Sequence, residues 1–123
     1  MNTITLEQLE TNIQAIIDEA ETAAYSAAKS FFSDVLGGQD KYACGFAWVN
    51  LYEFNGQRIT GNNKTGRILK KAGITQNYNR TFEVWNPSRF PCQNVDTLEH
   101  GAKAAAAVFS KYGFKAYAGS RLD

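Results

Sequence analysis

The chain has 123 residues, of which 44% are hydrophobic, and both values are typical of one folded domain. Thirteen basic and twelve acidic residues give a net charge of +1, which alone argues for no class of partner. No apolar stretch approaches the roughly 18 residues of a membrane-spanning helix, and the first residues lack a secretory signal. We therefore expect a single domain, residues 1–123, that is cytoplasmic and has no membrane partner.

The cysteine and histidine content excludes several kinds of site. Cys44 and Cys92 are too few for a disulfide framework, and with one histidine they do not supply a four-ligand zinc site. We expect no metal and no cofactor. Cys92 and His100 lie eight residues apart, so a thiolate–imidazole pair in a small Cys/His enzyme is one alternative. Cys44 is predicted to be a small core residue of a packed strand.

Residues 6–36 predict one long helix, because apolar or small side chains recur at steps of three and four. Thr5 and Gln8 form a capping box, and Gly37-Gly38 ends the helix. Some thirty residues span roughly 45 Å, which is long for so small a domain. The helix either packs along its own sheet, breaks near Ala23-Ala24, or shares its apolar stripe with a second subunit.

The middle of the chain predicts a β-hairpin. Large aromatic and small side chains alternate over residues 42–54, and since both faces are mostly apolar we expect a central strand covered on both sides. Asn55-Gly56 is typical of a type I′ turn, and residues 57–60 would form the return strand.

The remaining elements complete an α+β domain. Thr65 is expected to cap a helix over residues 66–72, and residues 81–85 alternate like a strand. A second capping box, Asp96 to Glu99, begins a helix that Gly113 ends, before a strand over residues 114–118. The order α-β-β-α-β-α-β predicts a small mixed sheet of three to four strands with helices packed on it. Residues 1–38 would be the N-terminal helix and residues 41–123 the α+β core.

Charge is unevenly distributed along the chain. Residues 1–40 hold seven acids and one base, a net charge of −6, whereas residues 56–90 hold seven bases and one acid, a net charge of +6. The near-neutral total is therefore a cancellation between an acidic helix and a basic middle segment.

Two places in this sequence predict ligand binding. The turn 61–67 leads into a helix N-terminus, whose free N–H groups and nearby bases favour a phosphate-bearing ligand. Trp85 and the polar residues after it end a strand, and the segment around Arg121 joins them if the strands bearing Trp85 and Tyr117 run the same way. The predicted ligand-binding residues are Lys64, Arg67, Lys70, Trp85, Asn86, Ser88, Gln93 and Arg121.

Four segments together resemble a known family. They are Cys44-Gly45-Phe46-Ala47-Trp48-Val49, the segment 66–73, Trp85-Asn86-Pro87-Ser88 and the stretch 113–123. In this pattern residues 43–123 are similar to a family of small proteins encoded in tailed-bacteriophage genomes. The resemblance implies an accessory protein made in the cytoplasm of an infected bacterium; it implies no activity and no functional residue.

These observations predict a binding protein rather than an enzyme. The first hypothesis is a phage accessory or counter-defence protein that binds, without turnover, a nucleotide, a cyclic nucleotide or a host protein. The first alternative is a nucleic-acid-binding protein that uses the basic segment 56–90, with Tyr78 for stacking. The acidic helix opposes this alternative unless it faces away from the nucleic acid. The Cys/His enzyme is the second alternative, and a homodimer or higher oligomer through the N-terminal helix is a separate prediction.

Overall fold

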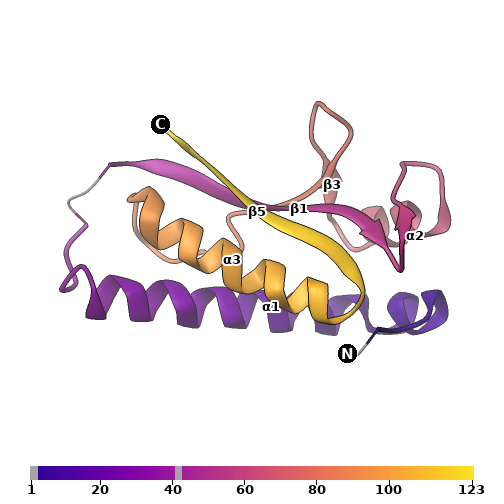
Figure 1. The fold of residues 1–123 in the computed structure, drawn as a ribbon, viewed down its shortest axis with the longest axis horizontal. Helices are drawn as coiled ribbons and strands as arrows, with labels where there is room; N and C mark the ends of the chain where they lie inside the picture. Colours follow the sequence, from indigo (N-terminus) through magenta and orange to yellow (C-terminus); the bar gives the residue numbers. More distant parts are fainter. Residues whose placement is uncertain (1–2, 41–42) are drawn as a thin grey trace.

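The computed structural model describes residues 3–40 and 43–123, and its elements follow one another as shown in Figure 1. The α+β class predicted from the sequence is confirmed, and the described residues form five strands where three to four were expected. The elements are α1 (Leu6–Asp34), β1 (Gly45–Phe54), β2 (Gln57–Arg58), α2 (Lys64–Lys71), β3 (Thr75–Gln76), β4 (Phe82–Trp85), α3 (Val95–Lys111) and β5 (Phe114–Leu122).

All pairings in the sheet are antiparallel, and β1 is its central strand. β5 pairs with one edge of β1 over nearly its whole length, while β4 and β2 share the other edge and β3 adds to β4. The sheet is therefore not mixed. Because β4 and β5 both run against β1, they run in the same direction on either side of it. The additional strand, β3, is two residues long and was not among the predicted elements.

The helices pack on one face of this sheet. Ala47, Val49 and Leu51 of β1 are buried toward the helices, where α3 packs on β1 and β5. α1 lies along the far side of α3, so α3 separates it from the sheet (Figure 1). Within residues 3–40 and 43–123, no helix covers the opposite face, where Phe46 and Trp48 lie. The prediction that β1 is covered on both sides is therefore wrong.

The long helix α1 is continuous and packs within its own chain. Its apolar stripe continues through Ala20, Ala24 and Ala28, which are at most 1% exposed. The backbone of α1 comes close to α3 at Gly101, where an added Cβ would lie 3.1 Å from the Ala24 carbonyl oxygen. Lys111, the last residue of α3, and Tyr112, which follows it, also donate hydrogen bonds to the Glu19 carboxylate. The stripe that motivated dimerisation through α1 is therefore buried by α3, and dimerisation stays a prediction.

The start of α1 is as predicted, whereas α2 and α3 each begin two residues earlier than expected. The capping box of Thr5 and Gln8 is confirmed. α2 is capped by Asn63 rather than Thr65, and α3 by Asn94 rather than Asp96, because each asparagine accepts the N–H of the residue three positions on, at 2.9 and 2.8 Å. The positive φ angles at Asn55-Gly56, 50° and 80°, agree with the predicted type I′ turn. The predicted beginning of β1 at Tyr42 lies outside the described residues.

Candidate functional site

A row of aromatic side chains occupies the open face of the sheet. Trp48 of β1 lies opposite Trp85 of β4, and their rings are nearly parallel, at 5°, with centroids 5.7 Å apart. Phe46 packs beside Trp85 at 5.6 Å, and Tyr52 packs beside Tyr117 at 6.0 Å. Trp85 is 50% exposed and Tyr117 55% exposed, so planar apolar surface faces solvent. We call this surface the aromatic face; it comprises Phe46, Trp48, Tyr52, Trp85 and Tyr117.

The aromatic face depends on a glycine in the strand on the other side of β1. Gly119 of β5 pairs with Trp48, and a Cβ added there would lie only 2.6 Å from the Trp48 ring. The indole therefore lies over the β5 backbone. The stacked rings cover one another, which explains how large apolar side chains remain on this face without a helix over them.

Charged side chains of both signs lie at the aromatic face, three of them basic and two acidic. The guanidinium of Arg121 lies over the Phe46 ring, 5.3 Å from its centroid, and Lys115 lies 3.7 Å from the carboxylate of Glu53. Strand alternation adds Glu83 of β4 to this face, and Arg58 of β2 is exposed at its margin. The acidic helix α1 is in the layer farthest from it (Figure 1).

A pocket continues the aromatic face at the point where β4 ends. After Trp85 the chain turns at Asn86, whose φ is 44°, and returns beside β1. Gly45 donates its N–H to the Gln93 carbonyl at 2.9 Å, which holds the returning segment in place. The cavity enclosed has a volume of about 290 Å³, and we call it the end pocket. Its lining residues are Cys44, Gly45, Phe46, Ala47, Trp85, Asn86, Cys92, Gln93, Leu98 and Asp123.

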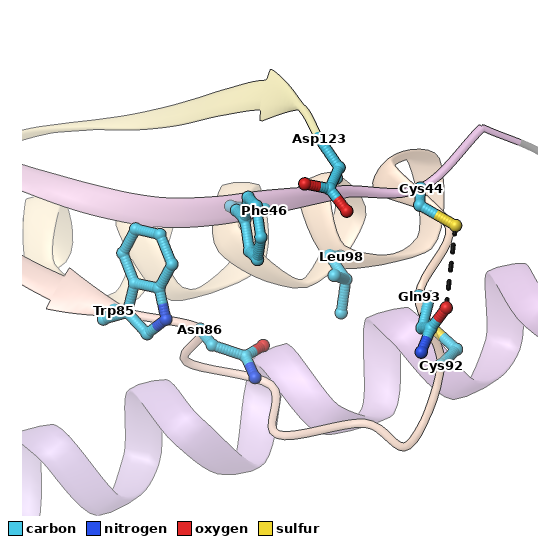
Figure 2. Close-up of a pocket in the computed structure, with 10 residues that line it drawn as sticks. Cys44, Phe46, Trp85, Asn86, Cys92, Gln93, Leu98 and Asp123 are labelled. Carbon is cyan, nitrogen blue, oxygen red and sulfur yellow. Dashed lines mark hydrogen bonds between the residues drawn. The ribbon is translucent and has the colours of Figure 1, made fainter.

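Polar side-chain groups in the end pocket are two thiols, two amides and a carboxylate. Figure 2 shows the Asp123 carboxylate and the amides of Asn86 and Gln93 around the space beside Phe46 and Leu98. The Asn86 Oδ1 is buried and accepts no hydrogen bond from any described residue. Within residues 3–40 and 43–123, no lysine or arginine lines the pocket, so the described interior suits an uncharged planar group with hydrogen-bond donors better than a phosphate.

Asp40 holds the far wall of the end pocket. Its carboxylate accepts hydrogen bonds from the Gln93 N–H at 2.7 Å and from both the N–H and the side-chain amide of Asn94 at 2.9 Å. These hydrogen bonds lower the pKa of Asp40 below its ordinary value, and the bond from the Asn94 side chain has the largest effect. The Asp40 carboxylate thus fixes the segment that carries Gln93 to the segment that follows α1.

The structure brings together part of the predicted ligand-binding set. Trp85, Asn86 and Gln93 line the end pocket, and Arg121 stands beside it on Phe46. The condition for this convergence, that the strands bearing Trp85 and Tyr117 run the same way, is met. Ser88 is instead buried, and its hydroxyl accepts the N–H of Phe90 at 3.2 Å.

The basic residues of α2 lie apart from this group, near the opposite end of β1 (Figure 1). Lys64 is 4.0 Å from the Glu10 carboxylate, and the side chains of Arg67 and Lys70 donate to backbone carbonyls of their own loop, those of Asn62 and Gly61. The cap residue of α2 already accepts the Gly66 N–H. These contacts engage the groups expected to hold phosphate.

Cys92 and His100 do not form the predicted pair. The His100 ring stacks on Phe31 with centroids 3.9 Å apart, and its Nδ1 lies 2.9 Å from the Asp96 carbonyl oxygen. Burial, and then the charge of Asp40, raise the pKa of the Cys92 thiol, which disfavours the thiolate that a nucleophile requires.

The position of Cys44 differs from the prediction that it is a small core residue. It is an exposed residue at the end pocket, and its thiol donates to Gln93 Oε1 at 3.6 Å; the prediction of a core residue is wrong. Cys44 precedes β1 and is not covered by the packed part of the sheet.

The sequence pattern identifies only Trp85 of the aromatic face as a candidate site residue. Phe46, Trp48 and Tyr52 alternate with small residues, and this pattern places them together on one side of β1, but it was interpreted as core. Asp123 carried no local signal, because only the long pairing of β5 with β1 brings it beside Cys44.

Comparisons of the chain with protein-family models, curated proteins and solved structures found no match. In the described part of the chain, no helix is both long and apolar enough to cross a membrane. The same residues contain no group of three or more His, Cys, Asp or Glu side chains placed to hold a metal ion.

Proposed function

We propose that this protein binds single-stranded nucleic acid on the aromatic face, stoichiometrically and without turnover. The observation that carries the proposal is the half-exposed row of rings on a helix-free sheet face. Successive bases stack on such rings with little regard to sequence, because every base has a planar π surface. The phage resemblance described above would place this binding in an infected bacterial cell.

The placement of charge is compatible with a polyanionic partner at this face, which carries three bases beside Glu53 and Glu83. Arg58, Lys115 and Arg121 surround the rings, whereas the six acids of α1 are on the far side of α3. The objection that an acidic helix would repel phosphates therefore loses its force, because α1 faces away. A phosphate-bearing ligand at α2 has less support, since its basic side chains are engaged by their own loop and by Glu10.

The test is fluorescence anisotropy with a labelled oligothymidylate of about twelve nucleotides at low salt, with a duplex of the same length as comparison. The protein should bind the single strand more tightly than the duplex, which cannot present its bases to the rings. With three basic side chains at the face, log affinity should fall with log salt concentration with a slope of ~−2.

Trp85→Ala should weaken this binding by about 5- to 150-fold, the equivalent of about 1–3 kcal/mol for one stacked base. Because Trp85 is 50% exposed, the variant should remain folded, which circular dichroism checks. Tyr25→Ala is the matched control, since Tyr25 is a 44% exposed aromatic residue on α1, away from the aromatic face. Equal affinities for the wild type and Trp85→Ala would refute the proposal, as would failure to bind the oligothymidylate.

A further inference from the structure

We infer that the end pocket reads one base of the bound strand and prefers guanine. The inference rests on the proposed function, since it assigns a base-selective pocket next to the aromatic face. Phe46 and Trp85 belong to both, so a base that leaves the row of rings reaches the pocket without crossing another element.

The pocket has the size and composition of a site for a single planar group. Its volume of about 290 Å³ is at the small end of the range for ligand sites. Phe46, Trp85 and Leu98 supply apolar surface, and the amides of Asn86 and Gln93 supply both donors and acceptors. Such a set recognises the hydrogen-bonding edge of a base, as single-strand-binding proteins do.

Asp123 distinguishes between the bases. An ionised carboxylate only accepts hydrogen bonds, and its two oxygens match two adjacent donors. Guanine presents that pair, the N1–H and the 2-amino group, and its O6 can accept from a side-chain amide of Asn86 or Gln93. Thymine and uracil have one ring N–H between two carbonyls, so they would place an oxygen against the carboxylate.

The phosphate of the same nucleotide would remain outside the pocket. The described lining contains no basic side chain, whereas Arg121 stands at the margin on Phe46.

The experiment compares three labelled oligonucleotides of equal length: oligothymidylate, the same strand with one central guanine, and the same strand with hypoxanthine in place of that guanine. The guanine should raise affinity by about 5- to 150-fold, the usual discrimination of one bidentate contact. Hypoxanthine lacks the 2-amino group and should lose most of this gain. Asp123→Asn should lose the guanine preference, whereas Asp18→Asn, the same change on the exposed side of α1, should retain it.

The two proposals fail in different ways. If both strands bind, equal affinity for the guanine and thymine strands would overturn the pocket inference and leave the proposed function standing. Free guanosine monophosphate, tested against adenosine monophosphate, separates the two sources of the base. Selective binding of the free guanine nucleotide without binding of either strand would support the pocket and overturn the proposed function. Absence of guanine preference in both the strand and the nucleotide assays overturns the inference.

Discussion

At the scale of single residues, Gly119 determines the position of the Trp48 ring. Gly119→Ala would place a Cβ 2.6 Å from the indole, so the ring must move away from Trp85 or the strands must separate. We expect a loss of stability of about 1–3 kcal/mol, as is usual for overpacking. Near-ultraviolet circular dichroism should change at the same time, because Trp48 and Trp85 are the stacked pair and the only tryptophans in the chain.

The matching control is a double-mutant cycle. If the clash with the ring is the cause, Gly119→Ala should cost much less in a Trp48→Leu background than in the wild type. An equal cost in both backgrounds would show that the Trp48 ring is not what makes glycine necessary there.

At the scale of the elements, Asp40 connects the segment that follows α1 to the wall of the end pocket. Its pKa in the folded protein lies below the ordinary value, so ionised Asp40 stabilises the fold. This contribution is complete above the unfolded-state pKa of about 3.9 and is lost as pH falls through the lower folded-state value. Acid should therefore loosen the contact to Gln93 and Asn94.

Asp40→Ala should reproduce this loosening at neutral pH. We expect faster hydrogen exchange at the Gln93 and Asn94 amides and a stability loss of about 1 kcal/mol, modest because the site is partly solvated. Asp34→Ala, another acidic change near the end of α1, should leave these amides unchanged. Unchanged exchange at Gln93 and Asn94 in Asp40→Ala would refute the assigned role.

The helices and strands also show which parts of the fold can be predicted from sequence patterns. The three-to-four-residue periodicity of α1 and the Asn55-Gly56 turn were predictable, because they depend on neighbours in the chain. The helix starts at Asn63 and Asn94 were misplaced because several nearby residues have side chains that can cap a helix. β3 could not be predicted from the sequence, because a two-residue strand has no periodic pattern and is defined only by its pairing with β4.

At the scale of the whole molecule, the opposed charges of the chain are distributed between layers. α1 carries most of the acidic excess and lies beneath α3, while the aromatic face is on the other side of the sheet (Figure 1). The charge asymmetry was visible in the sequence, but its direction in space was not, since it depends on which face of β1 the helices cover. Because the sequence does not show which face of β1 the helices cover, the aromatic residues of β1 are predicted to be core residues. For the same reason only part of the end pocket can be predicted from the sequence.

The central claim is that bases lie on the aromatic face, and mapping of chemical shifts tests it most directly. Unlabelled oligothymidylate would be titrated into isotope-labelled protein of 13.6 kDa, a size suited to backbone and indole N–H spectra. We predict shifts at the indole N–H groups of Trp48 and Trp85 and along β1, β4 and β5, with the exposed side of α1 unchanged. Shifts confined to α1 or to α2, or no shifts at saturating oligonucleotide, would contradict the account.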